Sequence, residues 1–524
     1  MSQIGAFVSY ATALPGYLAK PMSREQAARR LARSLTSREH NFLRVLDRGV
    51  YRNPASPYLA LLRWAGVEHG DVAKLVGNEG VEGALGKLYD AGVHVALDEI
   101  KGRRGIERPG LALPASRSAF DNPLLVHHYD AESSGSRGPR TRVMVDLGML
   151  EHEAAYVSHY LDAFGIRDRP YAVWRPVPPS AAAVKWMMRL EKLGKPLEKW
   201  FSQTKHAYSD GHARFALFTN ATFALGRSLG RRFPLPQHVP ADSPRPVTAW
   251  LADCVSKGQP AVLDTIVSSA VRVCLDAQQR GRDIAGTFFR VGGEPLSDAK
   301  RTVIESTGCR VVCFYSMTEM SFVGAPCADA DAPDDVHLLT DKVAALVRAR
   351  TIPGGTVDGL IYTTLLPSSP KLMLNVESGD FARLTTRTCK CPMGQLGFHS
   401  HLSGIRSYDK LTSEGVTFLG TELLRLIEEV LPAEFGGAPT DYQFVEIEEQ
   451  RFSRIHVMIS PQVGALDEQA VIARILGTLR SYPGGLAMTE VWERGDTLRV
   501  VRDTPRMTAS AKVLPLHLQQ SASR

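Results

Sequence analysis

The stretch of sequence that decides the fold is residues 286–320, GTFFRVGGEPLSDAKRTVIESTGCRVVCFYSMTEM. Its apolar opening predicts a buried strand that ends in Gly-Gly-Glu-Pro, and a helix and a second strand are expected to follow. Polar residues just past the C-terminal ends of strands are where α/β folds place their ligands. There, Tyr315 could stack on a base, Thr318 could bind a phosphate and Glu319 could hold Mg²⁺. Ordinary polar capping of a strand end is the alternative.

Strand-like and helix-like runs alternate around this stretch, from residue 142 to about residue 330. Such alternation predicts α/β layers. Beyond residue 355 the pattern changes to short strands with close turns. Residues 420–524 mix helices with strands, including a strand expected over 488–495. The expected fold class is an α/β multidomain protein, with a large N-terminal domain of layered sheets and helices and a small C-terminal α+β domain.

The composition excludes several classes of protein. The 524 residues are 44% hydrophobic and 22% charged, which rules out a wholly disordered chain. The net charge of +7 suits polyanionic small molecules such as nucleotides at least as well as nucleic acid, and no nucleic-acid partner is expected. The apolar N-terminal stretch lacks a preceding basic region, and no apolar run reaches about 20 residues, so neither a signal peptide nor a membrane span is expected. The expected location is cytoplasmic.

Residues 20–48 predict one amphipathic helix, because apolar side chains recur at near-helical spacing among arginines. Leu31 and Leu35 belong to its apolar side. The basic side is interpreted as a solvated surface, and an arm that binds nucleic acid is the alternative.

Two further segments carry residues suited to a nucleotide. Residues 133–138, SSGSRG, combine glycines, which let backbone N–H groups approach a phosphate, with hydroxyl and guanidinium donors. A flexible surface loop is the alternative, and the absence of GxxxxGK[ST] gives no support to a Walker-type fold. Residues 377–380, ESGD, place Asp380 in a tight turn, where its carboxylate could contact ribose hydroxyls; alternatively the segment is only a turn.

The seven cysteines, in a chain without an export signal, favour reduced thiols or metal binding over disulfides. One compact set has the Cys₃His composition of a closed structural zinc site. The residues of this set are Cys327, His337, Cys389 and Cys391. Unliganded cysteines are the alternative, with His399 and His401 as rival imidazole ligands. Cys309 and Cys313 are expected to be buried thiols.

Hydrolase chemistry has no support in the sequence. It contains neither a GxSxG nucleophile elbow nor an HExxH zinc motif. His127 and His128 precede the Ser/Gly-rich segment and could approach a bound acid, although polar packing explains them equally well.

Six motifs occur in a fixed order along the chain: SSGSRG, GGEP, YSMTE, ESGD, GIRSYDK and PRMTASAK. The set resembles the adenylate-forming superfamily and, within it, the phenylacetate–CoA ligase branch. The resemblance runs from about residue 50 to the end. It implies an ATP-binding large domain over residues 51–403, preceded by a helical extension over 1–50. Residues 404–524 would form a small lid, mobile about a hinge at Asp409 or Lys410.

The resemblance also implies roles for individual residues. The β- and γ-phosphates of ATP would lie against Ser133, Ser134, Gly135, Ser136, Arg137 and Gly138. Arg137 stands where the family usually has Thr, and it could supply the cation that this loop has lost. Gly293 and Glu294 would border the adenine pocket, and Tyr315 would stack on adenine or lie near the acyl group.

The remaining roles implied by the resemblance concern charge. Thr318 would contact the α-phosphate and Glu319 would bind Mg²⁺. Asp380 would bind the ribose, assisted by Arg406. Lys512 would bridge the substrate carboxylate and the α-phosphate. A Cys, a His and a late Cys-x-Cys also recur in the resembling branch, in agreement with the zinc set.

The implied reaction is activation of a carboxylic acid by ATP to an acyl-adenylate, with release of pyrophosphate, followed by acyl transfer to CoA and release of AMP. Alternatives are an amine, a carrier-protein thiol or a protein cysteine as acceptor, activation of a group other than a carboxylate, and nucleotide binding without turnover. A homodimer is common in the resembling branch. The sequence departs from the family's motifs at several further positions, namely Arg140, Ser316, Asn375, Val376, Ile405 and Ala511.

Overall fold

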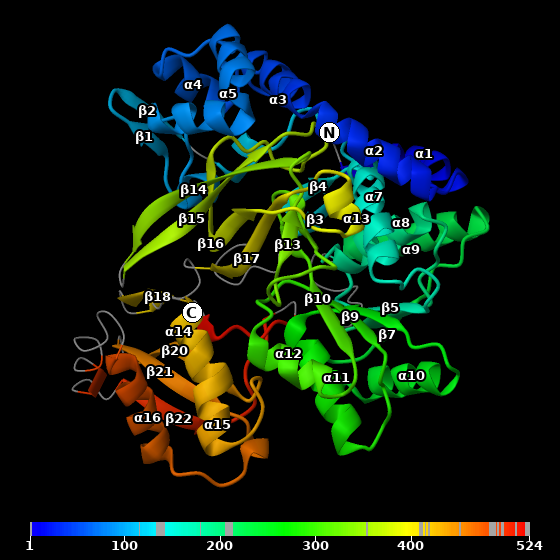
Figure 1. Ribbon diagram of the computed structural model, residues 1–524, viewed down its shortest axis with the longest axis vertical. Helices are drawn as coiled ribbons and strands as arrows, with labels where there is room; N and C mark the ends of the chain where they lie inside the picture. Colours follow the sequence, from blue (N-terminus) through cyan, green and yellow to red (C-terminus); the bar gives the residue numbers. More distant parts are fainter. Residues whose placement is uncertain are drawn as a thin grey trace.

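The computed structural model divides into a large body and a smaller part beneath it in the view of Figure 1. The residues that the structure describes are 3–114, 116–132, 142–178, 180–204, 213–352, 355–407, 412–413, 416–417, 420–449, 452–481, 489, 492–493, 497–508 and 511–518. Within them the α/β multidomain fold expected from the sequence is confirmed.

A six-stranded parallel sheet forms one layer of the large body, in the order β10-β9-β8-β5-β6-β7. Its strands are Tyr171–Trp174 (β5), Lys199–Ser202 (β6), Pro236–His238 (β7), Val262–Thr265 (β8), Phe288–Val291 (β9) and Arg310–Cys313 (β10). The chain builds outward from β5 to β7 and then returns to the other side of β5 with β8. Such a switch in strand order leaves a crevice at the C-terminal ends of the strands, where α/β folds bind ligands.

Helices accompany this sheet, as the alternating sequence pattern predicts. They are Leu147–Ala163 (α7), Ala182–Lys192 (α8), Ala213–Ser228 (α9), Arg245–Ser256 (α10), Val267–Gln279 (α11) and Asp298–Glu305 (α12). Asp146 caps α7 through the backbone amide of Gly148, and Ser297 caps α12 through that of Lys300.

A seven-stranded antiparallel sheet follows, in the order β11-β12-β13-β17-β16-β15-β14. Its strands are Tyr315–Met317 (β11), Ser321–Pro326 (β12), Val336–Leu338 (β13), Val343–Ile352 (β14), Gly355–Thr364 (β15), Val376–Thr386 (β16) and Ser400–Ser407 (β17). Only Phe314 separates β10 from β11, so the chain passes from one sheet to the other at this residue. Phe314 is buried and stacks on Phe322 at 5.0 Å between ring centroids. The turn after β11 therefore lies where the two sheets meet.

The N-terminal residues form helices that pack into the large body. These are Gln3–Ala19 (α1), Arg24–Thr36 (α2), Arg38–Leu46 (α3) and the π-helix Asp47–Tyr51 (η1). The single helix expected over 20–48 is wrong, because the chain leaves helical geometry at Ser37, with φ −94° and ψ 10°. Ser23 and Gln26 form a reciprocal cap at the start of α2. Leu31 and Phe42 are fully buried, in two different cores of the large body.

The small part is an α+β unit with its own core. Its elements are Gly420–Arg425 (α14), Leu426–Val430 (η3, a π-helix), Leu431–Phe435 (α15), Tyr442–Glu449 (β20), Phe452–Ile459 (β21), Pro461–Val463 (η4), Glu468–Arg480 (α16), Leu498–Arg502 (β22) and Leu516–Leu518 (β23). The sheet order is β22-β21-β20-β23. The strand expected over 488–495 is wrong, since the described residues there, Thr489, Trp492 and Glu493, are helical. Trp492 fills the core of the unit.

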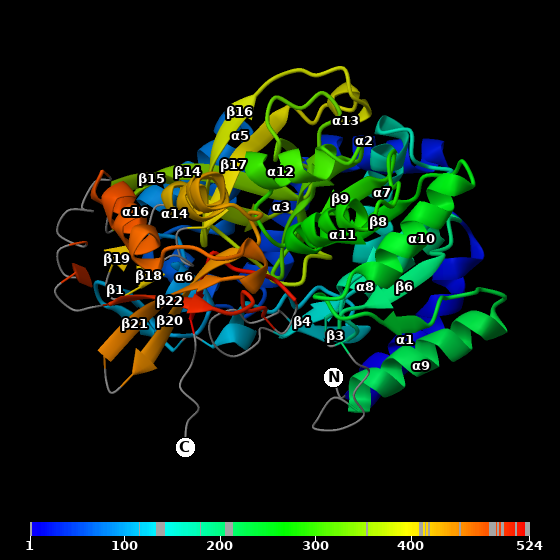
Figure 2. The ribbon, with the colours of Figure 1, turned by 90° about the horizontal axis from the view of Figure 1, so that it is seen from below.

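The remaining described elements lie between those already named. They are Pro57–Trp64 (α4), His69–Asp90 (α5), Leu97–Ile100 (α6), Ile106–Arg108 (β1), Leu111–Leu113 (β2), Arg117–Phe120 (η2), Tyr129–Glu132 (β3), Arg142–Val145 (β4), Pro392–Gln395 (α13), Thr412–Ser413 (β18) and Val416–Thr417 (β19). Seen from below, α16 lies at one end of the molecule and α9 and α10 at the other (Figure 2). Among the described helices, none has the length and apolar character needed to cross a membrane.

Candidate functional site

The glycines that follow β9 both occupy positions that exclude a side chain. A Cβ at Gly292 would lie 2.9 Å from the backbone carbonyl oxygen of Phe314. Gly293 has a φ of 87°, in the left-handed region that side chains rarely adopt. The Gly-Gly motif therefore keeps the end of β9 close to β10 and open above it.

Lys512 of the small unit reaches this opening. A Cβ built on Gly293 would lie 3.1 Å from Cε and 3.2 Å from Nζ of Lys512. The lysine ends a tight turn, in which the Ala511 amide donates to the Thr508 carbonyl at 2.7 Å and the Thr508 amide donates to the Lys512 carbonyl at 2.8 Å. The structure thus brings together two residues that are more than 200 positions apart and that the sequence assigned to one site.

Glu294 joins the large body to the small unit. Its buried carboxylate accepts hydrogen bonds from the backbone amide of Ser268 at 2.8 Å, from the Ser268 hydroxyl at 3.0 Å and from the backbone amide of Val513 at 2.8 Å. Ser268 belongs to the first turn of α11, and Val513 directly follows Lys512. The sequence places Glu294 beside adenine; the structure shows that its carboxylate holds the lysine-bearing segment.

Tyr315 and Asp380 lie together where β11 and β16 approach each other. The Tyr315 hydroxyl donates to Oδ2 of Asp380 at 2.7 Å. Burial raises the pKa of the Tyr315 phenol, and the nearby Asp380 carboxylate raises it further. The phenol therefore stays protonated and remains a donor to Asp380.

The Arg406 side chain binds the carboxylate of Asp334, not that of Asp380. Its Nη1 donates to Oδ2 of Asp334 at 2.9 Å. Asp334 also accepts from the backbone amides of Gly404 and Ile405, each at 2.9 Å. Residues 404–407 thus belong to strand β17 of the large sheet. The structure pairs Asp380 with Ser407 in the register of β16 and β17.

Thr318 and Glu319 lie in the turn between β11 and β12, and both are half-buried. The backbone carbonyl of Glu319 accepts from the amide of Lys371 at 3.0 Å, which fixes the turn. No described residue forms a hydrogen bond or ion pair with the Glu319 carboxylate. An oxygen donor of this kind fits the preference of Mg²⁺ for carboxylates.

Two further groups of residues were named by the sequence. Ser133, Ser134, Gly135, Ser136, Arg137 and Gly138 lie outside the described residues, as do Arg140, Asp409 and Lys410. His127 bonds to Asp130 at 2.9 Å, and His128 accepts from the amide of Leu147 at 3.2 Å. Both imidazoles are thus engaged in local contacts.

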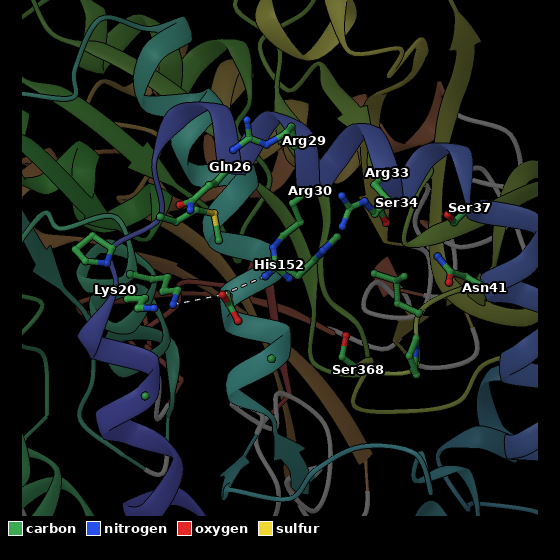
Figure 3. Close-up of a pocket in the computed structure, with 18 of the residues that line it drawn as sticks. Lys20, Gln26, Arg29, Arg30, Arg33, Ser34, Ser37, Asn41, His152 and Ser368 are labelled. Carbon is green, nitrogen blue, oxygen red and sulfur yellow. Dashed lines mark ion pairs between the residues drawn. The ribbon is translucent and has the colours of Figure 1, made fainter.

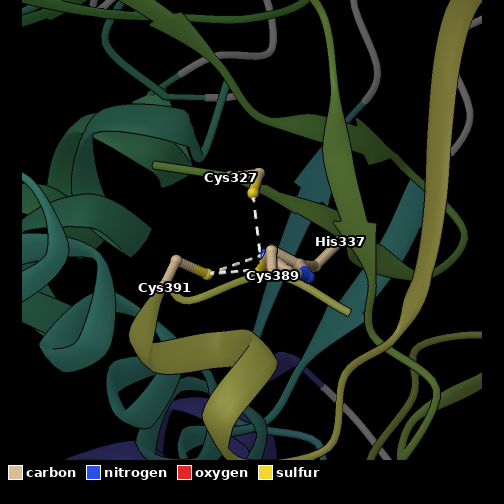
Figure 4. Close-up of side chains that lie close together, drawn as sticks. All are labelled: Cys327, His337, Cys389 and Cys391. Carbon is tan, nitrogen blue, oxygen red and sulfur yellow. Dashed lines mark hydrogen bonds between the residues drawn. The ribbon is translucent and has the colours of Figure 1, made fainter. Parts of the chain in front are cut away.

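The Cys₃His set converges in space (Figure 4). Its four ligand atoms, from Cys327, His337, Cys389 and Cys391, lie within 4.8 Å of one another. The Sγ atoms of Cys327 and Cys389 are 3.8 Å apart, and Nε2 of His337 is 3.6 Å from Sγ of Cys389. Zn–S bonds of about 2.3 Å in a tetrahedron require S–S edges of about 3.8 Å. Two other pairs are closer, with Sγ of Cys391 3.2 Å from Sγ of Cys389 and 3.0 Å from Nε2 of His337, so Cys391 would move outward slightly around an ion. With that adjustment the four donors fit a structural zinc site.

The surroundings of the set prepare its donors. Nδ1 of His337 bonds to the Phe398 carbonyl at 2.8 Å, which leaves Nε2 as the ligand atom. A hydrogen bond from the Cys327 thiol, followed by His337, lowers the pKa of the Cys391 thiol far below its ordinary value. Thiolates are the form that binds metal. His401 bonds to Asp335 at 2.9 Å and is not part of the set.

Three residues of the site were missed by the sequence analysis: Ser268, Asp334 and Val513. Each acts through a local contact of the backbone or of a short side chain. Of the three, only Val513 could have been found from the sequence, because it directly follows the PRMTASAK motif.

Comparisons with known proteins bear on the fold. No protein-family model and no curated protein sequence matches the chain. Among solved structures, 2-hydroxyisobutyryl-CoA ligase in the postadenylation state, in complex with R3-HIB-AMP, is 14% identical with a TM-score of 0.58. The match covers 93% of this chain and 89% of that chain. The same ligase in complex with 2-HIB-AMP gives the same values. The chain therefore has the fold of adenylate-forming CoA ligases.

Proposed function

We propose that this protein is an ATP-dependent ligase that activates a carboxylic acid as an acyl-adenylate and transfers the acyl group to the thiol of CoA. The observation that carries the proposal is the position of Lys512, whose ammonium group lies against Gly293 at the end of β9. Tyr315, Glu319 and Asp380 lie at the neighbouring sheet junction. The chemistry of an adenylating enzyme requires these residue types at one place.

The proposed chemistry depends on charge. A substrate carboxylate must attack the α-phosphorus of ATP, and both reactants are anions. Lys512 would bind both groups and align them, which lowers the cost of bringing like charges together. Mg²⁺ held by Glu319 would neutralise phosphate charge. The bond between the α-phosphorus and the bridging oxygen breaks, so pyrophosphate leaves and the mixed anhydride forms.

Other residues would position the nucleotide. Asp380 keeps one carboxylate oxygen on the Tyr315 hydroxyl, and its second oxygen suits a ribose hydroxyl. Glu294 would act indirectly, by holding Val513 and with it the turn that carries Lys512. We also propose that Cys327, His337, Cys389 and Cys391 bind a structural zinc ion, because all four sites of a tetrahedron are then filled by the protein.

Pyrophosphate exchange into ATP, measured against a panel of carboxylic acids, tests the adenylation step. We expect exchange with at least one acid, and a loss of about 100-fold or more in Lys512→Ala. Lys74→Ala is the matched control, since Lys74 is an exposed lysine on α5 with 80% of its side chain accessible. Absence of exchange for every acid, with Lys512→Ala equal to the wild type, would contradict the proposal.

Addition of CoA to an exchanging reaction tests the acceptor. Formation of acyl-CoA and AMP supports the proposed acceptor. Exchange without thioester formation would instead indicate an amine or a protein-bound thiol as the acceptor.

A further inference from the structure

A strongly basic cavity of about 860 Å³ lies between α2 and the large body. Its size falls within the range of small-molecule sites. Figure 3 shows its long wall, formed by α2, with α7 and the 366–368 segment across from it. Its charged lining residues are Lys20, Arg29, Arg30, Arg33, Arg44, Glu151 and Lys192. None of the described residues named above for nucleotide or zinc binding lines it.

The basic lining follows from helix periodicity. Gln26, Arg30, Arg33 and Ser37 recur every three or four residues, so they share one face of α2 and its continuation. Leu31 directly follows Arg30, so it lies on an adjoining face of α2, and it is buried in the core of the large body. Packing of the apolar face therefore fixes the direction in which the basic face points.

Among the described residues that line the cavity, the single carboxylate is already paired. Glu151 forms ion pairs with Arg30 at 3.1 Å and with Lys192 at 3.3 Å. The side chains of the remaining cations form no hydrogen bond or ion pair with any residue that the structure describes, although the exposed Glu25 lies within electrostatic reach of Arg29. These cations are Lys20, Arg29, Arg33 and Arg44. Four positive charges that face one concave space repel one another, and an anion would relieve that repulsion.

The wall is fixed before any ligand arrives. The amide of Met22 donates to the Lys192 carbonyl at 2.7 Å, and Nζ of Lys192 donates to the Tyr17 carbonyl at 3.0 Å. The Tyr17 hydroxyl in turn donates to the Met188 carbonyl at 2.9 Å. These bonds tie the segment between α1 and α2 to α8, so binding need not order it.

We propose that this cavity binds a small molecule that carries two or more phosphate groups. Guanidinium groups bind phosphate oxygens in pairs, and several of them arranged around a cavity match a multiply charged anion. No Phe, Trp or Tyr is among the described residues that line the cavity. Single-stranded nucleic acids bind largely by stacking their bases on aromatic side chains, so a small oligophosphate fits this lining better than an exposed strand.

Calorimetric titration of the full-length protein with inorganic tripolyphosphate tests the proposal. We expect saturable binding that weakens as the salt concentration rises. The double variant Arg29→Gln/Arg33→Gln should weaken this binding at least about tenfold, because each guanidinium removed costs charge-assisted hydrogen bonds. Arg24→Gln is the matched control, since Arg24 lies on the same helix, is exposed and does not line the cavity.

A third variant should change binding in the opposite direction. Glu151→Gln removes the one carboxylate among the described lining residues and frees Arg30 from its ion pair, so tripolyphosphate should bind several-fold more tightly. Equal binding by the double variant and the wild type would overturn the proposal, as would an equal loss in Arg24→Gln. Tighter binding of an oligodeoxythymidine or of a poly-glutamate peptide than of tripolyphosphate would also overturn it.

Two controls separate this site from the nucleotide site. The thermal midpoint of the double variant should match that of the wild type, because Arg29 and Arg33 are exposed. ATP binding and pyrophosphate exchange should also be unchanged in the double variant. Loss of exchange together with tripolyphosphate binding would show that one site serves both, and would overturn the proposal of a separate one.

Discussion

The cysteine cluster can close only because Gly394 has no side chain. A Cβ at this position would collide with both the backbone carbonyl and the Sγ atom of Cys389. The backbone amide of Gly394 meanwhile donates to Sγ of Cys391 at 3.4 Å. The Cys-x-Cys pair can thus fold back on itself only because the residue five positions after Cys389 has no side chain.

We expect Gly394→Ala to lower the zinc content of the purified protein, because the new methyl group must push Cys389 out of the ligand set. Metal analysis measures this, and Cys391→Ser should give a comparable loss. Gly477→Ala serves as the control, since a Cβ there meets no atom within 4 Å. Wild-type protein with less than about half an equivalent of zinc, unchanged in Cys391→Ser, would count against the site itself.

Asn375 is a structural residue at one of the positions where the sequence departs from the family's motifs. It adopts a φ of 49°, and its side-chain amide donates to the buried carbonyls of Leu85 at 2.9 Å and Val93 at 3.1 Å. We expect Asn375→Ala to destabilise the protein by about 2–4 kcal/mol, through unsatisfied carbonyls and left-handed strain. Asn375→Gly should cost less, because glycine removes the strain. Equal thermal midpoints for the two variants would contradict this account.

Motif order predicted that Gly293, Tyr315, Asp380 and Lys512 share one site, and the structure places Lys512 against Gly293 and Tyr315 against Asp380. Motif order could not show that Glu294 holds a backbone amide of the other unit, because such a bond depends on how two distant segments dock. Ala511 replaces the glycine of the family motif yet keeps a φ of 61°, so the backbone there has the conformation that glycine would favour.

At the scale of elements, periodicity predicted the alternating strands and helices well and their interruptions poorly. The composition of residues 20–48 does not change at Ser37, so nothing in the sequence indicates that a helix ends there. The helix breaks because α2 packs on one core and α3 on another. Residues 488–495 carry the β-branched and aromatic side chains of a strand. Trp492 instead enters the core of the small unit from a helical turn, so tertiary packing outweighs local propensity.

Helix α7 is tied to the sheet junction by a buried charge cluster. Glu153, fully buried, accepts from Nζ of Lys342 at 2.7 Å and from the Phe322 amide at 3.2 Å, and it also binds Arg189. Burial alone would raise the pKa of Glu153, but Lys342 and Arg189 outweigh burial and lower it. The carboxylate therefore stays ionised and holds the two cations between the layers.

We expect Glu153→Gln to destabilise the protein by about 3–5 kcal/mol at neutral pH, because two buried cations lose their counter-charge. A lowered folded-state pKa gives stability that is full above the unfolded value of about 4.3 and declines as the pH falls below it. The difference in stability between the wild type and Glu153→Gln should therefore narrow on acidification. Urea unfolding at several pH values measures this, and a gap that widens in acid would refute the account.

At the scale of the molecule, a second contact joins the two units beside the Glu294 contact. Nζ of Lys300 on α12 lies 2.7 Å from Oε1 of Glu428 in η3, and both side chains are at most 5% exposed. The Ser297 hydroxyl also donates to Glu428. A charge buried at an interface is costly once its partner is removed.

We expect Lys300→Ala to weaken the docking of the small unit on the large body and to reduce pyrophosphate exchange, because Glu428 loses its counter-charge and keeps only the Ser297 hydroxyl, so Lys512 is held less firmly at Gly293. The double variant Lys300→Ala/Glu428→Ala should recover part of that loss, with a coupling of about 1–3 kcal/mol. Small-angle scattering reports the weakened docking. Alanine replacements of the exposed pair Arg474 and Glu434 are the control. Additive effects of the two interface substitutions would contradict the proposed pairing.

Glu294 is hydrogen-bonded both to Ser268 of the large body and to Val513 of the small unit, and this affects how fast the two units could dock. Ser268, within the large body, supplies two of the three hydrogen bonds to the carboxylate, so the carboxylate keeps its orientation whether or not Val513 is present. When the small unit docks, the Glu294 carboxylate would already be in the rotamer that accepts the Val513 amide. When the small unit undocks, the two hydrogen bonds from Ser268 would keep the Glu294 side chain in place. Movement of the small unit, which the family resemblance implies, would therefore require no slow rearrangement of the large body at this point.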